Sequence, residues 1–215
     1  MNVITTTTRA LGFVAALSLA TWAQASPLTM FAADFEGDLS GWTEREPANP
    51  SGLLVADPVG AGHGQVLTFQ RAGSSGTLFS SNAVLSNSGK FTLTFDYLGR
   101  WNELGTYSDL GGYIGVASGI DGAGLWMGGT GIHPTPIDLI DDGEWHSYSM
   151  TFNSEWGTSL RVVLEDWDGS GTIVGDAFFD NISLQAVPEP TSLALVGLAL
   201  FAVGATAKRR ASPAA

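Results

Sequence analysis

Apolar and polar residues alternate with a period of two at several places in the middle of the chain. The alternation is found at residues 66–69, 91–97, 145–152, 160–164 and 177–184. A period of two places successive side chains on opposite faces of a β-strand. Turn signals rich in Gly, Asn and Asp separate these runs, at residues 60–64, 87–89, 121–122, 142–143 and 168–169. The middle shows no helical period, so the pattern predicts one all-β domain, an antiparallel β-sandwich of about eight to ten strands.

Composition supports short strands joined by tight turns. The 215 residues include 28 Gly, well above the usual ~7%. There is no Cys, which excludes disulfides and thiolate metal sites. A domain of this kind depends on its apolar core, or on a bound hard cation such as calcium.

The N-terminal segment differs from the middle and reads as a signal peptide over residues 1–25. Arg9 and the amino terminus supply positive charge, residues 11–20 are apolar, and Ala23 and Ala25 form an A-x-A cleavage site. The alternative is an N-terminal membrane anchor. The apolar run of about ten residues is short for a hydrocarbon core of ~30 Å, which favours a cleaved signal helix.

The C-terminal segment has three parts in a fixed order. Pro188, Glu189 and Pro190 come first and disfavour regular structure. An apolar run at residues 192–207 follows, at the short limit for a transmembrane helix. It is followed by the basic residues Lys208, Arg209 and Arg210. By the positive-inside rule the basic end stays in the cytoplasm, which places the domain outside the inner membrane.

This three-part order resembles the PEP-CTERM sorting signal. The resemblance implies recognition by an exosortase, cleavage near the Pro-Glu-Pro motif, and delivery to the cell surface or extracellular matrix. A plain C-terminal anchor helix is the alternative. The chain is therefore divided into a signal peptide (1–25), a β-sandwich domain (26–187) and a sorting tag (188–215) with a transmembrane segment at about 192–207.

The predicted domain is strongly acidic. Residues 26–187 contain five basic and twenty acidic residues, a net charge of −15. Such a domain repels phosphates, so nucleic acid is not an expected partner. The acidic residues are read either as a solvated surface or as a source of carboxylates for calcium.

A second resemblance is carried by short motifs in order along the domain. Residues 34–37 (Asp-Phe-Glu-Gly) are followed by Gly41-Trp42, and residues 179–184 close the domain with an Asp and a Leu. Together with the strand at 145–152, these motifs resemble jelly-roll carbohydrate-binding modules. The resemblance implies that the first and last strands lie side by side.

The same resemblance implies a structural calcium ion. Its candidate ligands are Glu36 and Asp180, with Asp34 as a weaker third. Backbone carbonyls would complete the six to eight oxygens that calcium prefers. The alternative is that these are ordinary solvated acids. No organic cofactor is expected.

Glycan binding requires aromatic rings that stack on sugars, and the chain has seven Trp. We interpret Trp42 and Trp145 as core residues, because they stand at motif positions of the resembling modules. The predicted ligand contacts are Trp101 with its neighbours Arg100 and Glu103, and Trp167 in the run Glu165-Asp166-Trp167 at a strand end. Trp126 and Trp156 are left without an assigned role.

The sequence has no catalytic motif that we identify. His63, His133 and His146 lack metal-ligand spacing, and there is no nucleophile elbow or P-loop. Glu165 and Asp166 are adjacent and should point to opposite faces of their strand. The first hypothesis is a non-catalytic surface module that holds exopolysaccharide or another glycan. The alternative is a structural or adhesion protein of the matrix, and a small hydrolase is a weaker third.

Overall fold

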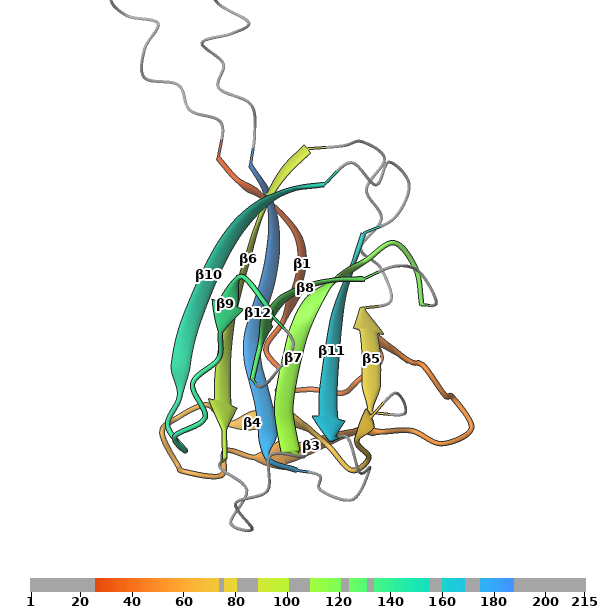
Figure 1. Ribbon diagram of the computed structural model, residues 1–215, viewed down its shortest axis with the longest axis vertical. Helices are drawn as coiled ribbons and strands as arrows, with labels where there is room; N and C mark the ends of the chain where they lie inside the picture. The colour runs from red at the N-terminus through yellow and green to blue at the C-terminus, as the bar shows by residue number, and fades with distance from the viewer. Residues whose placement is uncertain are drawn as a thin grey trace, which may run out of the picture. The chain divides into compact units, whose positions relative to one another are not determined.

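Strands make up all the regular structure in the described part of the chain. The computed structural model describes residues 26–73, 76–80, 89–100, 109–120, 124–130, 134–154, 160–168 and 175–187. The strands in these ranges are β1 (Leu28–Ala33), β2 (Trp42–Glu44), β3 (Gly52–Ala56), β4 (Gln65–Phe69), β5 (Thr77–Ser80), β6 (Gly89–Gly99), β7 (Asp109–Ala117), β8 (Gly124–Gly129), β9 (Ile137–Asp138), β10 (His146–Ser154), β11 (Arg161–Asp168) and β12 (Ala177–Val187) (Figure 1). They belong to one compact unit, Leu28–Val187. The predicted signal peptide, sorting tag and C-terminal apolar segment lie outside the described residues.

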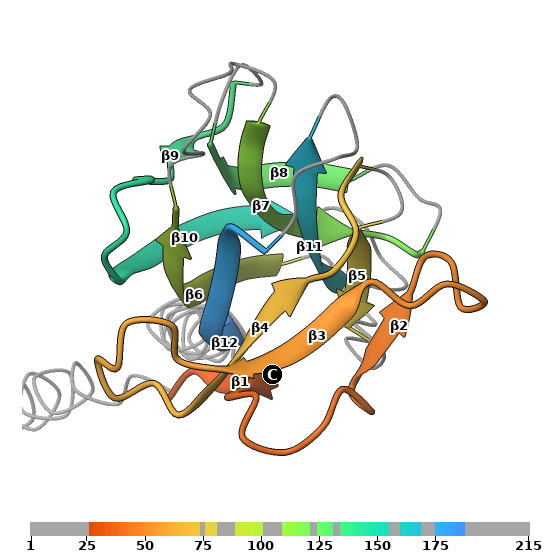
Figure 2. The same ribbon diagram turned by 90° about the horizontal axis from the view of Figure 1, so that it is seen from below.

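Two sheets form the unit. The β6 sheet has the order β10-β6-β12-β4-β3, with β1 also paired to β12, and the β11 sheet has the order β2-β5-β11-β7-β8-β9. The view from below shows them as two layers, with β7, β8 and β11 in one and β3, β4 and β12 in the other (Figure 2). The predicted β-sandwich is confirmed.

Alternating burial along the strands explains why these sequences form a sandwich. In β6, Leu93, Phe95 and Tyr97 are buried, whereas Thr92, Thr94 and Asp96 between them are only partly buried. The same alternation runs along β10, which pairs with β6 in unbroken register from His146↔Tyr97 to Ser154↔Gly89. One face of each strand therefore packs into the core and the other does not.

The core joins the inner faces of both sheets. Its fully buried large side chains include Phe69, Phe95, Tyr97, Phe179, Ile114, Met127 and Leu164. Phe179 makes two aromatic contacts, at 5.2 Å to Tyr97 and 6.4 Å to Phe69 between ring centroids. Burial of each such side chain contributes roughly 1.5–3 kcal/mol. This packing holds the two sheets face to face.

Trp42 and Trp145, both predicted to be core residues, are half-buried. Trp42 packs against the core and stacks on Phe35, with ring centroids 5.7 Å apart. Trp145 packs against a separate small cluster on the outer face of the β6 sheet, which consists of Val66, Leu98 and Phe178. Trp42 thus matches the prediction, whereas Trp145 covers a satellite cluster.

The five predicted strand segments all occur, within slightly different bounds. The described residues contain twelve strands instead of eight to ten, because short pieces such as β2 and β9 carry too few residues to show a period. One pair departs from the predicted antiparallel arrangement, since β9 runs parallel to β8. Within the described ranges we find no helix long and apolar enough to cross a membrane.

The first and last strands of the unit are neighbours, as the resemblance to jelly-roll modules implied. β1 pairs antiparallel with β12, from Leu28↔Ala186 to Ala33↔Ile182. Before that point β12 pairs instead with β4, through Phe179↔Leu67. The change of partner coincides with an irregularity in β12 between Asp180 and Ser183, where Asn181 has a φ of 49°. Asn tolerates this left-handed conformation better than most residues.

Candidate functional site

The outer face of the β11 sheet carries an unusual set of side chains. Along β11, Val162 and Leu164 join the main core, so Val163, Glu165 and Trp167 lie on the opposite face. Strand pairing aligns Glu165 with Thr77 on one side and with Tyr113 on the other. In the neighbouring row, Val163 pairs with Gly115, and Gly115 with Trp126.

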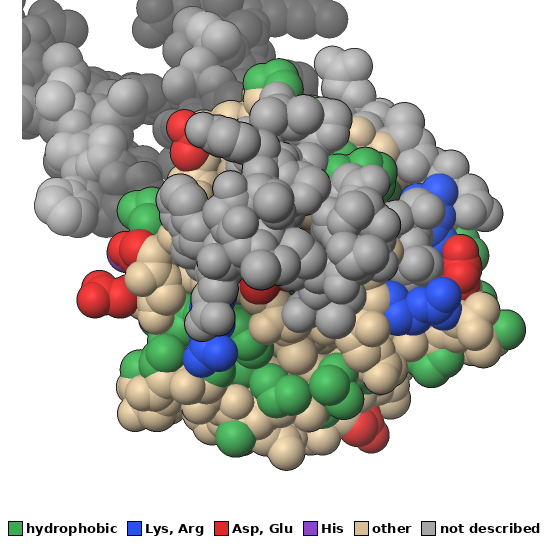
Figure 3. All heavy atoms as spheres, turned by 60° about the horizontal axis from the view of Figure 1, so that its bottom comes forward, with side chains coloured by type: hydrophobic (Ala, Val, Ile, Leu, Met, Phe, Trp, Pro, Cys, Tyr) green, Lys and Arg blue, Asp and Glu red, His purple; other side chains and the backbone are tan. Residues whose placement is uncertain are grey.

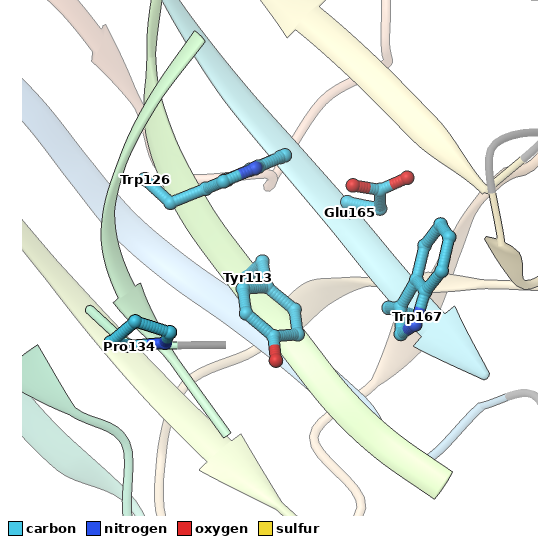
Figure 4. Close-up of a pocket in the computed structure, with 5 residues that line it drawn as sticks. All are labelled: Tyr113, Trp126, Pro134, Glu165 and Trp167. Carbon is cyan, nitrogen blue, oxygen red and sulfur yellow. The ribbon is translucent and has the colours of Figure 1, made fainter. Parts of the chain in front are cut away.

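An open cavity of about 380 Å³ lies on this face of the sheet. The described residues that line it are Tyr113, Trp126, Pro134, Glu165 and Trp167. Figure 4 shows the Glu165 carboxylate between the indoles of Trp126 and Trp167, with Tyr113 on the adjacent strand. The volume is in the range of small-ligand pockets, and the combination of aromatic rings with one polar group is typical of them.

Two glycines allow the rings to take these positions. A Cβ on Gly129 would lie 2.3 Å from the Tyr113 ring, so the ring occupies the space that a side chain would fill. A Cβ on Gly115 would lie 2.4 Å from the Leu125 carbonyl oxygen, at a register shift between β7 and β8. The close backbone approach at this shift therefore requires glycine.

Trp126 is held in place by apolar neighbours. Its ring makes an edge contact with Tyr113, with centroids 5.7 Å apart. It also packs against a cluster of Phe79, Ala117 and Val163 on the same face. One side of the indole is thus fixed, and Trp126 as a whole remains half-buried beside the cavity.

Glu165 is the acidic residue of the cavity, and it is only 7% exposed. Burial raises the pKa of its carboxyl to about 7, against the opposing effects of a hydrogen bond from Thr77 and the charge of Arg45. The Thr77 hydroxyl donates to Oε1 at 3.1 Å. At neutral pH the carboxyl is therefore divided between its protonated and ionised forms.

The predicted ligand residues do not gather at one place. Trp167 lines the cavity. Arg100 instead lies over the Phe178 ring, at 5.4 Å from its centroid, and donates to the Pro58 carbonyl at 3.2 Å. Phe178 belongs to the satellite cluster on the β6 sheet, so Arg100 and Trp167 stand on different sheets. Trp101 and Glu103 lie outside the described residues.

Sequence reasoning did not select Tyr113 or Trp126 as binding residues, and it included Glu165 only within the strand-end run Glu165-Asp166-Trp167. The run at 124–129 (Gly-Leu-Trp-Met-Gly-Gly) shows little alternation, because glycines stand where side chains would reveal the period. The signal that existed was the pair Glu165 and Trp167, two residues apart and therefore on one face of a strand.

Two of the three predicted calcium ligands, Glu36 and Asp180, contact the end of the loop between β3 and β4. The Glu36 carboxylate lies against Gly64 and accepts a hydrogen bond from the Gln65 backbone N–H at 3.1 Å. Asp180 Oδ2 lies 2.7 Å from His63 Nδ1. The two acids thus contact consecutive residues, 63–65, where the loop joins β4. Asp34 is exposed and accepts from the Glu36 backbone N–H at 3.3 Å.

Asp180 is the buried member of this group, with 2% exposure. Burial raises the pKa of its carboxyl, which the hydrogen bonds from His63 and Asn181 partly oppose. Its Oδ1 is buried and accepts no hydrogen bond from the described residues. Among these residues, no three His, Asp or Glu side chains converge on one metal position. Any ion here would need backbone oxygens as further ligands.

Comparison with protein families identifies the C-terminal segment. The model of the PEP-CTERM protein-sorting motif matches residues 186–210. The motif marks a protein for export and surface sorting by an exosortase. A comparison with curated proteins found no match.

Solved structures with a similar chain trace include carbohydrate-binding modules. The CBM22-1–GH10 xylanase 10B of Clostridium thermocellum, complexed with xylohexaose, has a TM-score of 0.51 at 12% identity, over 76% of this chain and 29% of that one. The CBM22-1 xylan-binding domain of Xyn10C from Paenibacillus barcinonensis has a TM-score of 0.49 at 16% identity, over 78% of this chain and 99% of that one. A Stig cyclase from Fischerella has a TM-score of 0.49 at 22% identity, over 77% of this chain and 99% of that one.

The match to the Clostridium chain shows a common fold and confirms the predicted jelly-roll-like sandwich. This chain spans less than a third of that two-module protein. The chain thus combines a jelly-roll-like β-sandwich with a PEP-CTERM sorting motif at residues 186–210.

Proposed function

We infer that this chain is an exported surface protein whose β-sandwich binds a glycan, without catalysis, on the outer face of the β11 sheet. The observation that carries the inference is the pocket lined by Tyr113, Trp126, Glu165 and Trp167, in which both Trp side chains are half-buried and Tyr113 is 2% exposed. Aromatic rings stack on the apolar faces of sugars, and a carboxyl group bonds their hydroxyls.

The fold and the sorting motif support this inference. The sandwich is shared with a module solved together with xylohexaose. The sorting motif favours a place at the cell surface or in the extracellular matrix, where the domain would meet a glycan such as exopolysaccharide. The signal peptide at 1–25 and cleavage near Pro188 are parts of the same proposal.

The cavity is better suited to binding than to hydrolysis. Most glycosidases use two carboxyl groups that flank the scissile bond. Among the described lining residues Glu165 is the single acid. Its neighbour Asp166 is fully buried on the core side of β11 and cannot serve as the second.

We also propose that calcium binds between Glu36 and Asp180. Both are hard oxygen donors, they contact one loop, and Asp180 Oδ1 is buried without a hydrogen bond. When bound, the ion would supply positive charge that compensates the buried carboxylate. Its role would be structural, since it would tie the loop to both ends of the domain.

The glycan proposal is tested by affinity measurement on the full chain in mild detergent. The chain is passed over immobilised polysaccharides, including that of the producing cells. We expect retention on at least one, with a loss of about tenfold or more in affinity for Trp126→Ala or Trp167→Ala, because stacking contributes ~1 kcal/mol or more per ring.

Leu53→Ala is the matched control, since it removes exposed apolar surface from the outer face of the β6 sheet. It should bind as the parent does. A folded chain that no glycan retains would leave the structural or adhesion protein as the better account.

A further inference from the structure

The cavity also indicates what charge its ligand carries. Three aromatic rings and one buried carboxyl line it, and its described lining includes no Lys or Arg. Among the described lining residues, an anionic sugar such as a uronate would meet the Glu165 carboxyl and no Lys or Arg side chain. The described lining therefore favours a cationic ligand over an anionic one on electrostatic grounds.

With a neutral sugar, Glu165 could offset its burial only by taking up a proton, because a buried carboxylate without a counter-charge at contact distance is costly. A cation in the ligand would instead pair with the ionised form. Thr77 supplies one neutral hydrogen bond. Arg45 acts on Glu165 through its charge, but these two described residues form no ion pair. A cationic group in the ligand would provide the missing counter-charge at contact distance.

The rings favour the same kind of ligand. The faces of Trp and Tyr attract cations through their quadrupoles, with Trp the strongest. Trp126 and Trp167 lie on either side of the Glu165 carboxylate (Figure 4). A cation beside Glu165 would therefore also contact aromatic rings, which is the arrangement of known ammonium-binding cages.

The charge of the domain adds a long-range attraction. Residues 26–187 carry −15, and the acidic side chains on the face in Figure 3 stand at separate positions instead of in one patch. Such a field draws cations toward the whole domain. Selectivity must then come from the cavity.

We propose that the sugar unit held in this cavity carries a protonated amino group, so that the ligand is a glycan with free hexosamine amines. The proposal rests on the proposed glycan-binding function and names the class of glycan. The amine would pair with Glu165, and the pyranose ring would stack between Trp126 and Trp167.

Two oligosaccharides that differ only in this group test it. The full chain in mild detergent is titrated calorimetrically with the hexamer of glucosamine and the hexamer of N-acetylglucosamine. We expect the glucosamine hexamer to bind about tenfold more tightly, the effect of one charge-assisted contact. Glu165→Gln should abolish that preference, because it keeps the shape of the side chain and removes its charge.

Glu144→Gln tests whether the preference comes from the cavity or from the net charge of the domain. Glu144 is an exposed acid in the turn before β10, so this variant makes the same change in net charge. Its affinity should stay within about twofold of the parent. Equal weakening by both variants, or a parent with no preference between the hexamers, would overturn the proposal.

The outcomes also distinguish the amine proposal from the glycan-binding function on which it rests. Binding to neutral polysaccharides that Trp126→Ala abolishes, with no preference for the amine, overturns the amine and leaves glycan binding intact. Failure to bind any glycan overturns both.

Discussion

Glu165 and Asp166 are neighbours with the same charge, yet their surroundings differ. Glu165 lines the cavity and meets Thr77. Asp166 is fully buried on the other face, where its Oδ2 accepts from the Gly175 backbone N–H at 3.4 Å. The alternation of a β-strand is sufficient to cause this separation. A single residue position thus decides which of two acids can meet a ligand.

The raised pKa of Glu165 makes the stability of the domain depend on pH. The folded state holds this proton more tightly than the unfolded chain, with a pKa of about 7 against 4.5. The contribution of this bound proton to the free energy of unfolding is therefore complete below pH 4.5 and is lost as the pH rises to about 7. By 1.36 kcal/mol per pKa unit, the loss is at most about 3 kcal/mol.

Glu165→Gln should remove this dependence, because the amide does not titrate. Urea unfolding of parent and variant, followed by Trp fluorescence at a series of pH values, measures it. The difference in unfolding free energy should change between pH 4.5 and about 7 and stay constant above. A difference that is the same at all pH values would contradict a buried, titrating Glu165.

At the scale of elements, the loop between β3 and β4 is organised by one carboxylate. Asp57 accepts backbone N–H groups of Val59, Gly62 and His63 and the Trp145 indole N–H, at 3.0–3.3 Å. Although burial tends to raise the pKa of Asp57, the hydrogen bonds from Trp145 and the backbone lower it well below its ordinary value. The His63 ring stacks on Trp145, with centroids 4.1 Å apart. The loop is thereby fixed onto the outer face of the β6 sheet.

Asp57→Asn should loosen this loop, because an amide has one acceptor oxygen and lacks the negative charge. We expect a loss of about 1–3 kcal/mol in unfolding free energy and faster amide exchange at residues 59–63. Asp38→Asn is the control, since Asp38 accepts a local hydrogen bond from the Ser40 backbone at 2.9 Å and is exposed. Unchanged exchange in the Asp57 variant would show that the loop is held by its apolar contacts.

At the scale of the whole domain, the first and last strands are joined by pairing and by their contacts with this loop. β1 and β12 are paired in one antiparallel ladder. Glu36 follows the end of β1, and Asp180 lies at the irregularity of β12. Both acids contact residues 63–65. A cation at this place would therefore stabilise three distant parts of the chain together.

Calcium should raise the melting temperature of the full chain by several degrees, since a ligand of the folded state stabilises it by mass action. Scanning fluorimetry with added calcium and with EDTA measures the shift. Asp180→Asn should lose the calcium response, and Asp38→Asn should keep it. The same melting temperature with calcium and EDTA would overturn the proposed ion.

The amino-acid sequence alone was enough to predict the sorting motif and five of the strand segments. The Pro-Glu-Pro motif, the apolar run and the basic end act as a contiguous signal, so no fold is needed to read them. Strand segments such as 91–97 are visible because burial of one face imposes a period of two. That β1 and β12 lie side by side was predicted from the order of the short motifs, through the resemblance to jelly-roll carbohydrate-binding modules.

The cavity was decided by the tertiary structure. It depends on register between β11, β7 and β8, which brings Glu165 to Tyr113 and Gly115 to Trp126. Register is set by the packing of whole sheets, and a shift of one residue would turn these side chains to the other face. The raised pKa of Glu165 has the same origin, since desolvation exists only after the sheets have closed around the carboxyl group.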